Sequence, residues 1–318
     1  MPYGEQERNW WSIAIFEALG TLLLVYFSIT GDHQAIAISL AFFTCYLLFA
    51  PISRGHFNPA VTLGVWLGEI ADPPTDGQKE RQWGKEIRDF FLRLGAQVLG
   101  GVAGVFLAYV CLARHRMDGT YQVAQVFITK LCPKDPAQPD NCEREGDQQL
   151  QMIGTQSFLA FVFVLAFIVI RKKGIRPSED EIVQAVAIAL VFFGLTHVGS
   201  QSGASFNPVL SGSMLLFEYI ASPTSVHGIT TYLAAYLIGP FIGAVISALF
   251  AICISCFNLA QEEEDDKTAK ANQDSAVQKE IKSKKEENQA ADKDGEAKQG
   301  LTAGGDNEAD GTKDDKQS

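Results

Sequence analysis

Two short stretches of this 318-residue chain carry nearly the same sequence and constrain its fold more than any other feature. Gly55–Val61 reads Gly-His-Phe-Asn-Pro-Ala-Val, and Gly203–Val209 reads Gly-Ala-Ser-Phe-Asn-Pro-Val. Asn is a favoured helix N-cap and Pro suits the first helical position, so both stretches predict a helix start. The apolar runs that follow end near Ile70 and Ile220, short of the about 20 residues that a membrane crossing needs. Irregular backbone at membrane depth is tolerated only inside protein or along a water-filled cavity, so two such half-helices predict a pore.

The rest of the chain supplies segments long enough to surround that pore. Hydropathy predicts an all-α membrane protein with six transmembrane helices, in which the two re-entrant half-helices follow the second and fifth spans. The first span lacks the flanks of a cleaved signal peptide and is expected to be retained. The predicted spans are Trp11–Thr30, Ala35–Ala50, Phe90–Ala113, Ile153–Ile170, Ile182–Val198 and Thr230–Phe257.

The two halves of the apolar region repeat each other. Glu17 in the first span matches Gln156 in the fourth, and Gly100–Gly104 in the third matches Gly239–Gly243 in the sixth. Each half holds three spans, an odd number, so the second copy must lie inverted, with a shared site near the midplane. The glycine spacing predicts close packing of helices.

Composition separates a membrane domain from a polar tail. We predict an N-terminus at 1–10, a channel domain at 11–257 with repeats at 11–113 and 153–257, and a disordered tail at 258–318. The net charge of −11 comes largely from that tail, so it says little about the ligand of the membrane domain. The chain has no basic, aromatic-rich patch, and nucleic acid is not an expected partner.

Loop charge predicts the orientation in the bilayer. Lys and Arg gather after the first half-helix and after the fourth span, which places those loops and both termini in the cytoplasm, with the plasma membrane as the expected location. The loop at 114–151 then faces outward and holds Cys132 and Cys142. These two thiols pair if that compartment is oxidising and otherwise stay free. The cysteines are not spaced like a zinc site, and neither a metal nor a cofactor is expected.

The two Asn residues carry the chemistry of the predicted pore. Two half-helices aim the positive ends of their dipoles at one point, where a cation or hydrated proton is repelled. Asn58 and Asn207 add amide donors for an oxygen atom at that point. The site therefore suits small neutral molecules.

On these residues the chain resembles the aquaporin, or major intrinsic protein, family from about Trp11 to Phe257. The resemblance implies a right-handed bundle of six spans and two re-entrant half-helices, a pore in each monomer, and usually a homotetramer in the lipid bilayer. The matching stretches are Glu17–Thr21, Ile52–Gly64, Ala96–Gly100, Ser202–Pro208 and Ile238–Gly243.

The chain departs from the family at the outer selectivity filter. The second motif of the family usually continues Asn-Pro-Ala-Arg, but here Leu210 takes the position of the Arg. The usual spacing of the family places the other filter residues at Ile38, Ala204 and Leu195, or at His197 after a two-residue shift. An apolar filter tolerates solutes with a carbon backbone better than water, which favours glycerol, urea or hydrogen peroxide. Ser211 argues the other way, since glycerol-conducting members usually carry Asp there.

Three further polar residues are expected to hold the loops. In the family, a Glu at the position of Glu17 braces the first re-entrant loop, and Gln156 occupies the mirrored position. His56 either makes a hydrogen bond within the loop or acts as a pH gate.

The sequence therefore predicts a passive channel for small neutral solutes, including water, that excludes ions and protons. The alternative is a non-conducting structural or scaffold protein on the same fold, because an apolar ring can stay dry. An ion-coupled transporter would need ionisable residues at the midplane of these loops, and an enzyme would need a catalytic constellation that the sequence lacks.

Overall fold

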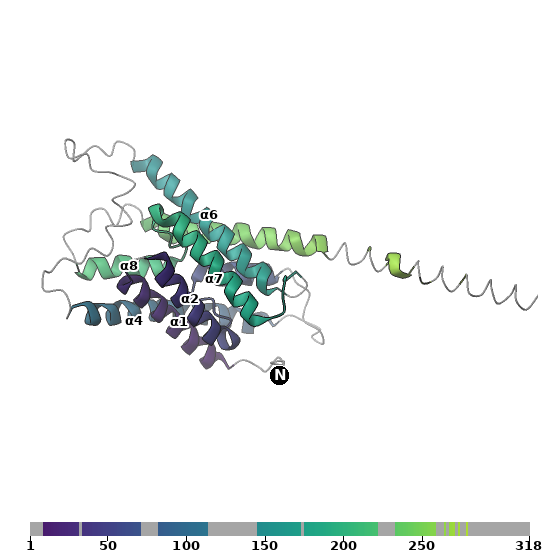
Figure 1. Ribbon diagram of the computed structural model, residues 1–318, viewed down its shortest axis with the longest axis horizontal. Helices are drawn as coiled ribbons and strands as arrows, with labels where there is room; N and C mark the ends of the chain where they lie inside the picture. The colour runs from purple at the N-terminus through teal and green to yellow at the C-terminus, as the bar shows by residue number, and fades with distance from the viewer. Residues whose placement is uncertain are drawn as a thin grey trace, which may run out of the picture. The chain divides into compact units, whose positions relative to one another are not determined.

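The structure is a computed structural model that describes residues 9–31, 34–70, 82–113, 145–172, 175–221 and 233–258, together with a few positions between 264 and 278. The chain divides into two compact units, residues 1–256 and 257–318. The first unit contains all of the features that follow (Figure 1).

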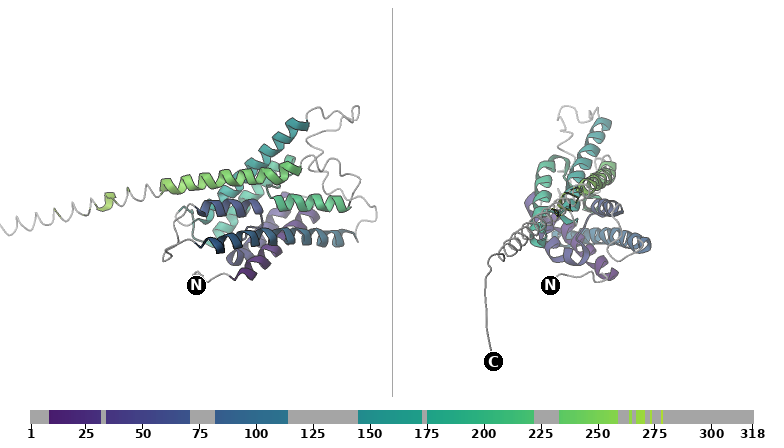
Figure 2. Two further views of the ribbon diagram at one scale, coloured as in Figure 1. Left: turned by 180° about the vertical axis from the view of Figure 1, so that it is seen from behind. Right: turned by 90° about the vertical axis from the view of Figure 1, so that its right-hand side faces the viewer.

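Six helices among the described residues are long and apolar enough to cross a membrane, which confirms the predicted spans. Figure 2 shows them from behind and from the side. They are α1 (Trp10–Thr30), α2 (Ala35–Ser53), α4 (Trp83–Ala113), α6 (Glu145–Arg171), α7 (Glu181–Val198) and an unlabelled sixth span (Leu233–Asn258).

The ends of these helices follow from local sequence. Asn9 caps α1 by accepting a hydrogen bond from the Trp11 backbone N–H, and Asp180 caps α7 in the same way. Helix α4 begins at Trp83, seven residues before the predicted Phe90. The predicted start was too late because the first turns of α4 carry charged side chains. Such residues lower hydropathy without disfavouring a helix, so hydropathy finds only the apolar part of α4.

The two short helices are present where the repeated motifs predict them. They are α3 (Pro59–Ile70) and α8 (Pro208–Ala221), and each starts at the Pro of its Asn-Pro pair. Helix α3 packs on α4 and α6, whereas α8 packs on α4 and α1, and the two short helices also contact each other. In both views α8 runs beside α4 (Figures 1 and 2).

Glycines allow the long helices to approach closely in both halves. A Cβ atom at Gly100 of α4 would collide with the backbone carbonyl of Ala18 in α1. A Cβ atom at Gly243 of the sixth span would collide in the same way with the carbonyl of Ser157 in α6. The close packing predicted from the glycine spacing is therefore confirmed, once in each half.

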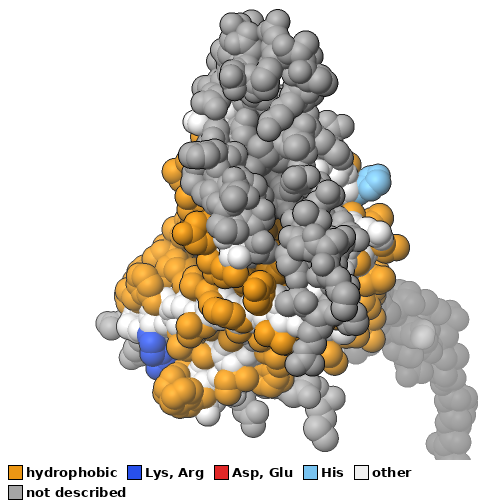
Figure 3. All heavy atoms as spheres, turned by 90° about the vertical axis from the view of Figure 1, so that its left-hand side faces the viewer, with side chains coloured by type: hydrophobic (Ala, Val, Ile, Leu, Met, Phe, Trp, Pro, Cys, Tyr) orange, Lys and Arg blue, Asp and Glu red, His pale blue; other side chains and the backbone are white. Residues whose placement is uncertain are grey.

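The outer surface of the first unit is apolar. On the face in Figure 3, the described side chains are mostly hydrophobic. Large side chains such as Leu40, Leu99 and Leu190 are 59%, 71% and 64% exposed. A surface of this kind is stable against lipid tails, so the helical bundle is an integral membrane protein.

Candidate functional site: the paired asparagine loops

The two repeated motifs meet and exchange hydrogen bonds. The amide nitrogen Nδ2 of Asn58 donates to the carbonyl oxygen of Phe206 over 3.1 Å, and Nδ2 of Asn207 donates to the carbonyl of Phe57 over 2.9 Å. Both Asn residues are buried. This reciprocal pair brings the N-termini of α3 and α8 to one point, although the residues lie about half the chain apart.

The side-chain oxygen of each Asn caps its own half-helix. Oδ1 of Asn58 accepts from the backbone N–H of Ala60 over 2.8 Å, and Oδ1 of Asn207 accepts from Val209 over 3.1 Å. The cap fixes the orientation of the amide, so its nitrogen points to the opposite loop. Within the described residues, one hydrogen of each nitrogen is used in this way, and the second is available to the oxygen of a small molecule.

The two loops have the same backbone conformation. Left-handed φ angles occur at Arg54 (75°) and Gly203 (77°), and at Phe57 (48°) and Phe206 (31°), which are matching positions. Gly55 (65°) and Ala204 (40°) form a third matching pair. A left-handed conformation at a bulky residue such as Phe is costly and persists only where the surroundings enforce it. Here it turns the two Phe carbonyls toward the opposite Asn.

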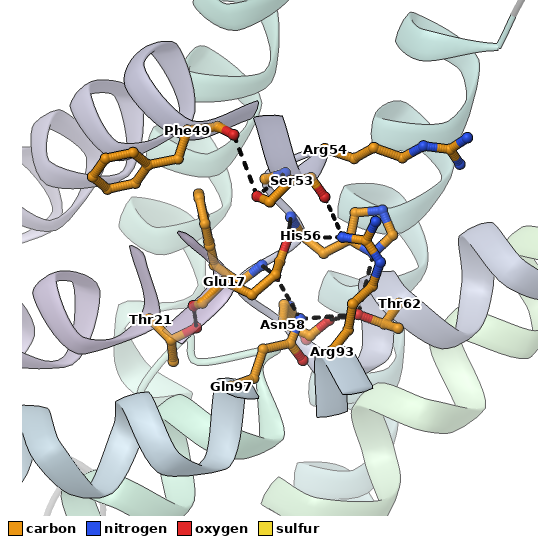
Figure 4. Close-up of polar contacts among 12 residues, drawn as sticks. Glu17, Thr21, Phe49, Ser53, Arg54, His56, Asn58, Thr62, Arg93 and Gln97 are labelled. Carbon is orange, nitrogen blue, oxygen red and sulfur yellow. Dashed lines mark hydrogen bonds and ion pairs between the residues drawn. The ribbon is translucent and has the colours of Figure 1, made fainter. Parts of the chain in front are cut away.

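A cluster that we call the charged brace holds the first loop (Figure 4). Its centre is Glu17 of α1, which is fully buried. The carboxylate accepts from the backbone N–H of His56 over 3.0 Å and from that of Phe57 over 2.8 Å. It also accepts from Arg93 over 3.0 Å and from Gln97 over 2.9 Å, both on α4. Four donors therefore satisfy one buried carboxylate.

The other members of the charged brace extend it to the half-helix. Arg93, itself buried, also donates to the backbone carbonyl of Ser53 at the end of α2. Gln97 donates to the hydroxyl of Thr62 over 3.0 Å, and Thr62 donates to the Asn58 carbonyl over 3.0 Å. The charged brace thus joins α1, α2, α3 and α4 to the first loop.

A second cluster, the neutral brace, holds the second loop. Oε1 of Gln156 accepts from the backbone N–H of Phe206 over 2.9 Å, and its Nε2 donates to the Ser202 carbonyl over 2.9 Å. The hydroxyl of Tyr236 on the sixth span donates to the same carbonyl over 2.9 Å. No described side chain in these three hydrogen bonds carries a charge.

The four predicted outer filter residues are buried or half-buried. Ile38 and Ala204 belong to a core cluster that includes residues of α2, α6, α7 and the two loops, and Leu195 packs against it. Leu210 belongs instead to a second core cluster with residues of α1, α4 and α8, such as Val25 and Met214. The structure therefore groups three of the four positions and assigns Leu210 to a different set of neighbours.

The remaining predicted residues fall into different environments. His56 of the first loop is buried, and its Nδ1 lies 3.2 Å from the hydroxyl of Thr62 in the first turn of α3. His197 is exposed and stacks on Phe193, with ring centroids 6.1 Å apart. Cys132 and Cys142 lie outside the described residues. Among the described residues, no group of His, Cys, Asp or Glu could hold a metal ion.

Sequence reasoning missed the partners of the two braces. Arg93, Gln97 and Tyr236 were not predicted to take part in the site. One signal was available for Arg93, since ionisable residues inside apolar spans usually pair with each other and Glu17 is another such residue. Gln97 and Tyr236 are uncharged residues in apolar spans, and the sequence gives no comparable signal for them.

A helical membrane bundle in which two half-helices meet at paired Asn residues is the architecture of a channel for small molecules. The family model described as "Major intrinsic protein" matches residues 5–75. The chain is 27% identical over 224 residues to "Aquaporin AqpM" of Methanothermobacter marburgensis, which covers 69% of this chain and 76% of that protein. It is 25% identical over 240 residues to "Aquaglyceroporin" of Toxoplasma gondii, which covers 74% of each.

Solved structures agree on the fold. The X-ray structure of the aquaglyceroporin from Plasmodium falciparum superposes with a TM-score of 0.59 at 16% identity and covers 78% of this chain and 98% of that one. The family model and these relatives support a kinship of the chain with the major intrinsic protein (aquaporin) family. Members of this family are membrane channels for water and small solutes, and the similarity supports a channel of that class here.

Proposed function

We propose that the chain is a passive channel for water and for small uncharged solutes such as glycerol, urea or hydrogen peroxide, and that it excludes ions and protons. One observation carries this proposal. The amides of Asn58 and Asn207 each bind the opposite loop and cap their own half-helix, so that two fixed donors and two helix N-termini share one buried point.

The charge distribution at that point supports the exclusion of cations. The start of each half-helix carries roughly half a positive elementary charge. An oxygen that accepts hydrogen bonds from the two amides would turn its own hydrogens away, which interrupts a chain of waters that could relay protons. A neutral molecule with one hydrogen-bonding oxygen would meet neither barrier.

The filter positions support passage of solutes larger than water. Ile38, Leu195, Ala204 and Leu210 are apolar, and the last of them replaces a cationic Arg. We infer that these four residues line the outer constriction, with Leu195 rather than the exposed His197 as the residue from α7. The similarity to a protein named aquaglyceroporin supports the same choice of solutes.

The wider arrangement is also proposed. We expect a homotetramer in the plasma membrane with both termini in the cytoplasm, a channel domain at 11–257, and a tail at 258–318, most of which lies outside the described residues. Glu17, Gln156 and His56 would hold the loops. Cys132 and Cys142 would be bonded only if their loop faces an oxidising compartment.

Stopped-flow light scattering of proteoliposomes tests the function. Shrinkage under an impermeant osmolyte reports water flux, and re-swelling under glycerol reports solute flux, each measured against empty liposomes. We expect both to be fast. Water flux without glycerol flux would contradict the apolar filter, and absence of both would favour a non-conducting scaffold.

The variant Leu210→Arg tests the filter directly. A cationic side chain there would narrow the constriction and bind water, so we expect glycerol permeability to fall about tenfold, which corresponds to about 1.4 kcal/mol. Leu210→Met conserves volume and polarity and should leave glycerol flux near that of the wild type. Unchanged glycerol flux in the Arg variant would mean that Leu210 does not line the pore.

A further inference from the structure

Four Phe side chains form a continuous cluster in the interior of the first unit. Phe42, Phe163, Phe192 and Phe206 are each at most 2% exposed. The rings of Phe42 and Phe192 are stacked at 4.6 Å with only 3° between their planes. The ring of Phe163 lies 5.8 Å from Phe42, 5.5 Å from Phe192 and 5.1 Å from Phe206.

The cluster lies next to the paired Asn residues at one end. Phe206 is the residue whose carbonyl accepts the hydrogen bond of Asn58, and its ring contacts those of both Phe163 and Phe192. The other end of the cluster adjoins the predicted outer filter. Phe42 follows Ile38 by four residues on α2, and Phe192 precedes Leu195 by three on α7, so each lies one turn along on the same helix face.

At the depth of the Phe cluster, side chains rather than closely packed backbones fill the space between α2 and α6. Among the labelled helices, α2 packs mainly on α1 and α7, whereas α6 packs mainly on α3 and α7. The contact between the rings of Phe42 and Phe163 nevertheless joins α2 to α6. A pore that passes from the filter to the Asn pair would cross this region, because α2, α7 and the second loop carry residues of both sets.

We propose that Phe42, Phe163 and Phe192 form an aromatic constriction within the pore, between the outer filter and the Asn pair, and that it limits the rate of permeation. This inference rests on the proposed channel function. The faces of these rings offer no hydrogen bond to replace those that a water molecule leaves behind, and an apolar constriction can close a pore by staying dry. Passage requires the stacked rings of Phe42 and Phe192 to separate.

The double variant Phe42→Leu/Phe192→Leu tests the constriction in the full chain. Each Leu keeps an apolar side chain but removes the ring that closes the gap. We expect water permeability per channel to rise about tenfold, equivalent to about 1.4 kcal/mol in the barrier, and glycerol permeability to rise with it. Channel number is counted by quantitative blotting of the same proteoliposomes.

Phe217→Leu is the matched control. Phe217 is a fully buried ring on α8 that belongs to the second core cluster, so its loss should lower thermal stability by a similar amount per residue without raising flux. An equal rise in flux in this control would show that loosened packing, rather than an opened constriction, explains the result and would overturn the proposal.

The possible outcomes separate this inference from the channel function. A wild type that conducts, with a double variant that conducts equally, would overturn the constriction and leave the channel in place. A silent wild type with a conducting double variant would support both. Silence of both proteins would overturn the channel function, and the constriction with it.

A second variant covers the case in which the double variant does not fold. Phe192→Trp enlarges the ring at the narrowest contact, and we expect permeability to water and glycerol to fall while the protein elutes as the wild type does in size-exclusion chromatography. Unchanged or higher flux in a folded Trp variant would also overturn the constriction.

Discussion

The two Asn-Pro loops have the same backbone but are held by different chemistry. Their left-handed residues match in position, from Arg54 and Gly203 to Phe57 and Phe206. Their half-helices start at equivalent residues and their Asn side chains make equivalent bonds. Yet a buried ion pair anchors the first loop, whereas the second is anchored by an amide and a phenol.

The two anchors differ in charge because they accept different numbers of hydrogen bonds from their loops. Glu17 has two carboxylate oxygens and accepts from two backbone N–H groups of its loop, at His56 and Phe57. Gln156 has one oxygen, accepts from one N–H, and uses its nitrogen to donate to a carbonyl. A charged anchor thus needs a cation such as Arg93, and a neutral anchor does not. The backbone conformation of the motif is the same with a charged anchor and with a neutral one.

The largest effect is expected when the charged brace loses its cation. Arg93→Leu would leave the Glu17 carboxylate buried without a counter-charge, which typically costs about 3–5 kcal/mol. We expect a loss of this size in the free energy of unfolding, measured by SDS titration in mixed micelles. A loss below about 1 kcal/mol would mean that the ion pair contributes little to the stability of the first loop.

Arg88→Leu is the control for that experiment. Arg88 lies on the same helix and pairs with Asp89, but its side chain is 50% exposed. Exposed pairs contribute at most about 1 kcal/mol, so this variant should remain close to the wild type.

A smaller loss is expected when the neutral brace gains a charge. In Gln156→Glu, the atom that replaces Nε2 would be an oxygen facing the Ser202 carbonyl, to which Nε2 now donates over 2.9 Å. The lost bond and the buried charge should together cost about 2–3 kcal/mol in the same titration. Gln151→Glu makes the same change at an exposed position of α6 and should shift stability by less than about 0.5 kcal/mol. Equal stability of the two variants would refute the view that the second loop requires a neutral anchor.

The smallest effect is expected at Tyr236. Tyr236→Phe removes the hydroxyl that donates to the Ser202 carbonyl, but that carbonyl still accepts from Gln156. We expect a loss of about 0.5–1.5 kcal/mol, the usual net contribution of one hydrogen bond. Tyr219→Phe, at a residue that is 58% exposed, is the control and should be neutral. A loss above about 3 kcal/mol would indicate that Tyr236, rather than Gln156, is the main anchor.

The sequence predicted most of the fold because each feature is encoded locally. Hydropathy located all six spans, and the Asn-Pro pairs located α3 and α8 to within a residue of their C-terminal ends. The packing of Gly100 and Gly243 followed from spacing alone. These predictions need only a pattern along one helix.

The parts of the site that were missed depend on contacts between distant segments. The pairing of Glu17 with Arg93 spans 76 residues, and that of Tyr236 with the second loop spans 34. The stacking of Phe42 on Phe192 joins two spans from different halves. A Phe in an apolar span has the same hydropathy whether it faces lipid or another ring, so no local pattern distinguishes the two.

The position of the charged brace within the chain also bears on how the protein is made. Its members, from Glu17 to Gln97, all belong to the first half, so the first loop can be anchored before the second half has left the ribosome. The amide of Asn58, in contrast, finds its acceptor only when Phe206 arrives. We therefore expect the first half to insert into the bilayer with its loop already anchored. The hydrogen bonds between the two Asn loops would form only after the second half has inserted.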